Sequence, residues 1–136
     1  MKINNIVPVI LVRNDCFWLP YVLESVRGRF NRYVLYDIGS NDGTDKIIDW
    51  FVNTENAEFF VRKLPDCPPI IQGAFRNSMI AEAKSDWYLI LDGDEIYSPT
   101  NLDNLKIWWD QRTLLEKSGS IFLYGVFKRI EVDKGL

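Results

Sequence analysis

The chain has 136 residues, the length of one ordinary domain, and can bury roughly two-thirds of its unfolded surface. Apolar residues make up 47% and charged residues 26%, as in soluble globular proteins. The formal net charge of −3 gives no general attraction to nucleic acid, so we expect no nucleic-acid partner. Histidine is absent, which excludes Ser-His and Cys-His nucleophile systems.

Alternating strand-like and helix-like patterns run along the chain. The predicted strands span residues 6–12, 33–38, 58–63, 87–92 and 120–129, and the predicted helices span residues 19–30, 44–54, 73–84 and 101–119. Pro20 suits the first turn of a helix, and Gly119 suits a C-cap. This order predicts an α/β fold: a Rossmann-like, mostly parallel sheet flanked by helices on both faces.

Four features are expected to be structural or to exclude a function. The arginines at 27, 29 and 32 are interpreted as cations near a helix C-terminus rather than a nucleic-acid site. Trp108 and Trp109 are interpreted as core or interface residues. Cys16 and Cys67 have neither the number nor the spacing of a disulfide framework or a zinc site. No apolar run approaches the roughly 20 residues of a membrane span, and no signal peptide is recognised.

Polar clusters follow three of the predicted strands. They are "RND" at 13–15, "DIGSNDG" at 37–43 and "DGDE" at 92–95. Ligands of open parallel sheets bind beyond the carboxyl ends of the strands, where strand order reverses, so we expect these loops to converge on one edge.

Each cluster also has a structural explanation when it is taken alone. Gly39 and Gly43 can serve turns that need positive φ, and Asp42 or Thr44 can cap a helix. A calcium loop is excluded, because aligning Gly43 with the EF-hand glycine would place Ile38 at the first ligand position.

Four motifs together carry a family resemblance. Asn14 and Asp15 follow the first strand, "DIGSNDGT" at 37–44 follows the second, Arg76 and Asn77 open the third helix, and "DGDE" ends the fourth strand. In this order they resemble the family 2 glycosyltransferases of the GT-A fold, especially the bacterial branch that adds sugars to surface polysaccharide and lipopolysaccharide. The likeness covers residues 6 to about 100. One Asp-x-Asp motif is weak evidence, whereas four ordered motifs are strong evidence.

The resemblance implies transfer of a sugar from a nucleotide donor, with a UDP-sugar as the expected donor and a divalent cation as cofactor. Mn²⁺ or Mg²⁺ prefers hard oxygen ligands and neutralises the charge of the departing diphosphate. By resemblance, Asp94 is the direct metal ligand, and Asp92 binds the metal through water or contacts the ribose. Asp37 is expected beside the base or ribose, with the backbone near Val12 and the side chain of Asp15 lining the same pocket.

Arg76 is expected at the base or the diphosphate, because a guanidinium matches phosphate oxygens. Asp15 is shorter than the glutamate common in the family, which leaves its ribose contact open. The resemblance further implies an inverting enzyme and a glycan or lipid-linked acceptor. The two cysteines, which form no disulfide framework, favour a reduced, cytoplasmic location, and peripheral association with the inner face of the membrane stays open.

The whole chain, residues 1–136, is expected to form a single nucleotide-sugar-binding domain that lacks the family's acceptor-binding half. No residue is assigned as the catalytic base, so the isolated chain is expected to bind donor but to transfer sugar poorly. Association with a second copy of this chain and association with a different partner chain both stay open as alternatives.

Two other functions compete with this one. A nucleotidyltransferase would be favoured by a glycine-rich, lysine-bearing loop after the first strand, and "VRNDCFW" is not such a loop. A non-catalytic sugar-nucleotide-binding or assembly module would be favoured by the expected lack of the family's second half.

Overall fold

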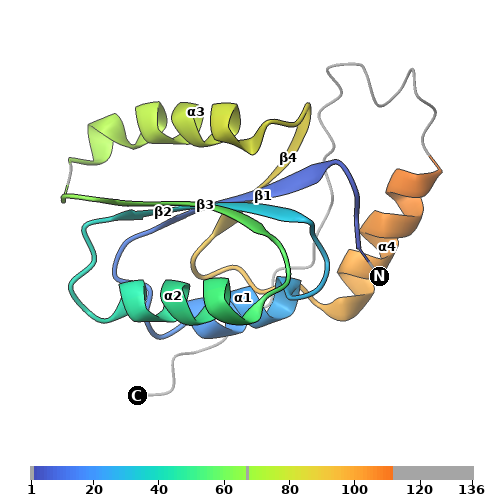
Figure 1. Ribbon diagram of the computed structural model, residues 1–136, viewed down its shortest axis with the longest axis horizontal. Coiled ribbons are helices and arrows are strands. Elements are labelled where there is room, and N and C mark those ends of the chain that lie inside the picture. The colour runs from blue at the N-terminus through green and yellow to red at the C-terminus, as the bar shows by residue number, and fades with distance from the viewer. Residues whose placement is uncertain (1, 67, 112–136) are drawn as a thin grey trace.

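The computed structural model describes residues 2–66 and 68–111. Its elements are β1 (Ile6–Val12), α1 (Leu19–Val26), β2 (Arg32–Ile38), α2 (Thr44–Thr54), β3 (Glu58–Leu64), the 3₁₀ helix η1 (Pro69–Ile71), α3 (Gln72–Ala83), β4 (Trp87–Asp92) and α4 (Pro99–Asp110). All three strand pairings in the sheet are parallel, and helices lie on both of its faces (Figure 1). The predicted α/β fold class is confirmed.

The sheet has the strand order β3-β2-β1-β4. The chain therefore leaves β1 in one direction to form β2 and β3, then returns to the other side of β1 to form β4. The pairing aligns the strand ends, because Val12 faces Asp37 on one side of β1 and Leu11 faces Asp92 on the other. Strand order thus reverses beside β1. Three of the four predicted motifs lie at this point, at the carboxyl ends of β1, β2 and β4.

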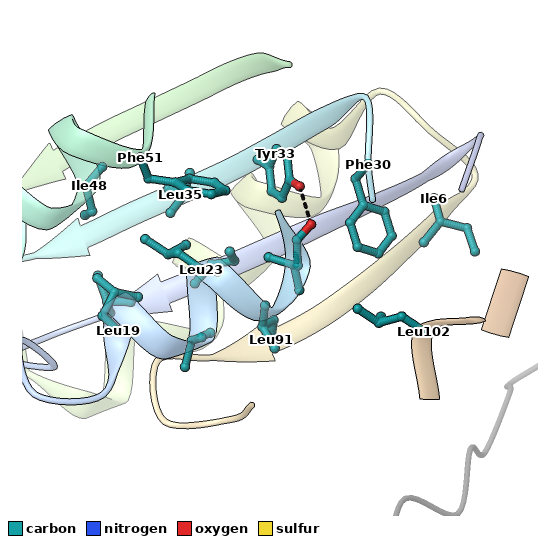
Figure 2. Close-up of a cluster of buried hydrophobic side chains, with 14 of the residues drawn as sticks. Ile6, Leu19, Leu23, Phe30, Tyr33, Leu35, Ile48, Phe51, Leu91 and Leu102 are labelled. Carbon is teal, nitrogen blue, oxygen red and sulfur yellow. Dashed lines mark hydrogen bonds between the residues drawn. The ribbon is translucent and has the colours of Figure 1, made fainter. Parts of the chain in front are cut away.

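Two apolar layers hold the sheet between its helices. Helices α1 and α2 cover one face, and α3 covers the other (Figure 1). On the first face α1 contributes Leu19 and Leu23, α2 contributes Ile48 and Phe51, and α4 adds Leu102 (Figure 2). On the opposite face Met79 of α3 packs in a second cluster with residues of β1 and β2. Strands β1 and β2 are buried almost throughout, as expected for a parallel sheet covered on both sides.

Tyr33 provides a polar contact inside the first layer. Its ring packs edge-on to Phe51 at 5.3 Å and stacks on Phe59 at 5.4 Å between centroids. Its hydroxyl donates a hydrogen bond of 2.9 Å to the carbonyl of Val26, drawn as a dashed line in Figure 2.

We expect Tyr33→Phe to lower the free energy of unfolding by about 1 kcal/mol, because one buried hydrogen bond is lost. The penalty stays small since the Val26 carbonyl keeps a second bond of 3.1 Å from the Arg29 backbone N–H. Urea unfolding measures the change. Tyr88→Phe, at a side chain that is 39% exposed, is the control, and an equal loss in both variants would contradict the role of the Tyr33 hydroxyl.

The first helix is shorter than predicted. It ends at Val26 rather than at residue 30, because Arg27 takes an extended ψ of 134° and Gly28 then takes a positive φ of 72°. The three nearby arginines each pair with an acid: Arg27 with Glu24, Arg29 with Asp103, and Arg32 with Glu58. Arg27 directly follows the helix end, and the other two lie beyond it. These guanidinium groups are therefore occupied within the fold.

Helix α4 carries both tryptophans that were predicted to lie in the core, and the described part of the chain ends just after it. Trp109 is buried, its indole N–H donates to the carbonyl of Asn4 at 2.8 Å, and Trp108 packs against the same core, so their predicted core role is confirmed. The helix begins at Pro99, with the Ser98 side chain as N-cap. Residues 112–119 of the predicted helix and the predicted strand 120–129 lie outside the described residues. Within the described ranges, no helix has the length and apolar character to cross a bilayer.

Candidate functional site

The loops after β1 and β2 are joined by four hydrogen bonds. The backbone N–H groups of Asn14, Asp15 and Cys16 donate to the side chains of Ser40 (2.9 Å), Thr44 (3.1 Å) and Asp42 (3.2 Å) respectively. In return, the Asn14 side-chain oxygen accepts from the backbone N–H of Asn41 at 2.9 Å. The first two sequence motifs therefore form one structural unit at the carboxyl edge of the sheet.

Asp42 has a structural role in this unit. Its carboxylate accepts bonds from the backbone N–H and the hydroxyl of Thr44, at 3.1 and 2.6 Å, as well as from Cys16. Burial alone would raise the pKa of Asp42, but these hydrogen bonds dominate and lower it from 3.8 to about 2. The N-cap of α2 itself is Gly43, with a φ of 96°, so the glycine fills the predicted positive-φ position.

The loop after β3 also reaches this edge, which the sequence did not reveal. Gly39 has a φ of 89°, and a Cβ built on it would lie 2.5 Å from both Cα and N of Asp66. Both carboxylate oxygens of Asp66 lie 2.9 Å from Arg13 Nη2. No local pattern in "LPDCPP" predicts this contact, because it depends on residues far away in the sequence. The loops after β1, β2 and β3 are thus in direct contact.

The acidic end of β4 meets the first loop at Gly93. This glycine is buried, and a Cβ on it would lie 2.5 Å from Oδ2 of Asp15. The Asp15 carboxylate therefore lies against the backbone between Asp92 and Asp94. Burial raises the pKa of Asp15, the backbone hydrogen bond from Arg13 opposes this rise, and the neighbouring charges of Asp94, Asp42 and Asp92 add to it. The predicted convergence of the three loops is confirmed.

Arg76 connects α3 to the end of β4. It lies in the second turn of the helix rather than at its start, because α3 begins at Gln72. Its Nη2 donates to Oδ1 of Asp92 at 2.9 Å. Its Nη1 is buried and has no hydrogen-bond partner within residues 2–66 and 68–111. Asp92 is held in a tight turn, since its backbone N–H donates to the Glu95 carboxylate and its carbonyl accepts from the Glu95 N–H, both at 3.1 Å.

The predicted nucleoside residues lie on the other side of β1. Asp37 is buried, with 3% of its surface exposed, and accepts a bond of 3.0 Å from the Ser40 N–H. Val12 is its partner on β1. Asp15 contacts the loops after both neighbouring strands, because its backbone N–H donates to Thr44 after β2 and its carboxylate lies against Gly93 after β4.

The exposed Asp94 completes the set of predicted side chains at this edge. In the part of the chain that the structure describes, no three acidic, cysteine or histidine side chains are grouped to hold a metal ion by themselves. Cys16 carries a free thiol, and Cys67 lies outside the described residues.

Comparison with known proteins gives likeness at the level of fold. No family model matches the chain. A TPR repeat-containing protein of Synechococcus elongatus is 30% identical over 111 residues, which cover 79% of this chain and 23% of that protein.

Among solved structures, S. aureus TarS 1–349 superposes with a TM-score of 0.62 at 20% identity, over 82% of this chain and 33% of the other. TarS 1–349 in complex with UDP gives a TM-score of 0.63 at 20% identity, over 82% of this chain and 32% of the other. The α/β Rossmann-like fold of this chain thus matches the fold of S. aureus TarS over the aligned region, and the chain spans about a third of that structure. Membership of glycosyltransferase family 2 stays a prediction.

Proposed function

We propose that this chain is the donor-binding domain of a metal-dependent glycosyltransferase. The observation that carries the proposal is the convergence of Asp15, Arg76 and Asp92 at the carboxyl edge of the sheet, where strand order reverses. A structure with the same fold has been solved in complex with UDP, which supports a nucleotide sugar as the ligand class.

The side chains at this edge fit a divalent cation that arrives with a diphosphate. Asp94 and Asp92 offer the hard oxygen ligands that Mn²⁺ or Mg²⁺ prefers. Because no three-ligand group exists among the described residues, the phosphate oxygens would complete the coordination shell. When bound, the cation would neutralise charge that develops on the leaving diphosphate.

The roles of the other residues follow from their positions. Asp37 and the backbone at Val12 would bind the base or ribose on one side of β1, and Asp15 would line the same pocket. The Arg76 guanidinium would bind phosphate oxygens, since its buried Nη1 lacks an acceptor among the described residues. A glycan or lipid-linked acceptor, an inverting course, a role in polysaccharide biosynthesis and action at the inner face of the membrane rest on the sequence resemblance, and no residue is assigned as base.

We expect UDP to raise the melting temperature of the chain in the presence of Mn²⁺, and to leave it unchanged in excess chelator. The physical reason is that the acids at the end of β4 would repel a bare diphosphate. Thermal shift with UDP, GDP, ADP and CDP measures the effect and ranks the bases. Equal stabilisation with and without the cation would contradict the proposal.

A non-catalytic sugar-nucleotide-binding module is the second candidate. It is kept because the site offers residues to bind a nucleotide sugar while no residue is assigned as base. Measuring donor hydrolysis beside nucleotide binding separates the two, because only a transferase domain is expected to release the sugar slowly to water.

A further inference from the structure

We propose that Arg76 is a resident counter-ion of Asp92 that makes cation binding depend on the diphosphate. This inference rests on the proposed function and adds an order of events to it. Without nucleotide, the guanidinium neutralises Asp92 and keeps a divalent cation weakly bound. When a diphosphate enters, its oxygens draw the guanidinium away, and Asp92 becomes available to the cation.

The first observation is that rigid elements hold this ion pair. Asp92 ends β4 and is paired in register with Leu11 of the central strand. Arg76 projects from the second turn of α3, a helix that packs on β1 and β2 through Met79 and Ala83. The two side chains meet at 2.9 Å and are 34% and 48% exposed. The contact therefore does not depend on a loose surface loop at either end.

The second observation is the charge around the pair. The charges of Asp42, Asp92 and Asp94 act on Asp15, so these carboxylates share one neighbourhood. A bare cation would be attracted to this group, but at Asp92 it must either displace Arg76 or accept repulsion from it. The ion pair consequently lowers the affinity for a cation that arrives alone.

The third observation is a hydrogen-bond donor of Arg76 that the pairing with Asp92 leaves unused. An arginine has five N–H donors, and Arg76 Nη1 is buried without an acceptor within the described ranges. A buried donor without a partner costs free energy, which a phosphate oxygen would recover. A diphosphate offers several oxygens in the fork geometry that guanidinium prefers, whereas Asp92 supplies only one contact. The exchange is therefore favourable only when the diphosphate is present.

The test measures Mn²⁺ affinity without nucleotide, by electron paramagnetic resonance of free Mn²⁺. We expect Arg76→Gln to bind Mn²⁺ roughly 3- to 10-fold more tightly than the unmodified chain, the range set by losing one partly exposed ion pair and the repulsion that accompanies it. UDP should then tighten Mn²⁺ binding less in the variant than in the unmodified chain, because the variant has no counter-ion for the diphosphate to displace; by reciprocity, Mn²⁺ should also tighten UDP binding less.

Arg32→Gln is the matched control. Arg32 also forms an ion pair, with Glu58 at 3.1 Å, and also has one buried nitrogen without a partner in the described chain, but it begins β2 at the opposite edge of the sheet. The Arg32→Gln substitution removes the same charge as Arg76→Gln but far from the site, so it should leave the Mn²⁺ affinity unchanged. Arg76→Met, which keeps the length of the apolar stem, replaces Arg76→Gln if that variant does not fold.

The outcomes separate the two proposals. If UDP fails to tighten Mn²⁺ binding in the unmodified chain, the proposed function is wrong. If UDP does tighten it, but neutral substitutions at Arg76 leave the nucleotide-free Mn²⁺ affinity unchanged or weaker, the counter-ion inference alone is overturned. A gain of equal size in Arg32→Gln would also overturn it, because the effect would then come from net charge.

Discussion

Alanine in place of Gly39 is expected to lower the free energy of unfolding by about 2–6 kcal/mol, a large share of the 5–15 kcal/mol typical of a domain. Two costs add. A φ of 89° is strained for any residue with a Cβ, and the new methyl group would lie 2.5 Å from Cα and N of Asp66. These are backbone atoms that cannot rotate aside, so the loop after β3 must move away from the edge.

Gly28→Ala is the control for that experiment. Gly28 also has a positive φ, 72°, but a Cβ there would meet no atom within 4 Å. Its loss of stability, about 1–3 kcal/mol, therefore reports backbone strain alone. Urea unfolding of both variants measures the difference. Equal losses would show that the approach of Asp66 to Gly39 is not close in solution.

Asp94→Asn is expected to weaken UDP binding in the presence of Mn²⁺ by at least about 10-fold, because even indirect partners of a metal site typically contribute 10- to 100-fold. The amide keeps the size of the side chain and loses its charge, so a direct electrostatic contribution disappears while the fold is retained. Asp94 is exposed, so this substitution should leave the melting temperature without ligand nearly unchanged. Calorimetric titration with UDP and Mn²⁺ measures the loss.

Asp42→Asn should show the opposite pattern. Its carboxylate accepts hydrogen bonds from Thr44 and Cys16, so the substitution should lower stability more than it lowers Mn²⁺-dependent affinity. Because its pKa is lowered to about 2 in the fold, its contribution is fully present above pH 4 and is lost as the pH falls toward 2. Equal losses of affinity at Asp42 and Asp94 would contradict the assignment of Asp94.

The sequence predicted those parts of the site that local pattern determines. The strand β4 was predicted with its observed bounds, since the apolar run 87–91 ends at an acid and a glycine. The meeting of the loops followed from the parallel topology. By contrast, the pairing of Arg76 with Asp92 and the contact of Asp66 with Gly39 depend on how separate segments pack, and no residue spacing encodes that. The predicted helix runs past Gly28 to residue 30, whereas α1 ends at Val26, because helical spacing of apolar residues does not show where the backbone turns.

The strand order also has a consequence for how the chain folds. Strand β2 follows β1 after one helix, but the other partner of β1, strand β4, follows only after two further α-helices, the 3₁₀ helix η1 and a third strand. Pairing across that longer separation costs more chain entropy, so we expect β1, β2 and β3 to associate first and β4 to be added later. Until then, one edge of β1 exposes unpaired backbone beside apolar residues such as Val7 and Val9. A nascent chain is therefore expected to be most prone to aggregate in the interval before β4 emerges from the ribosome.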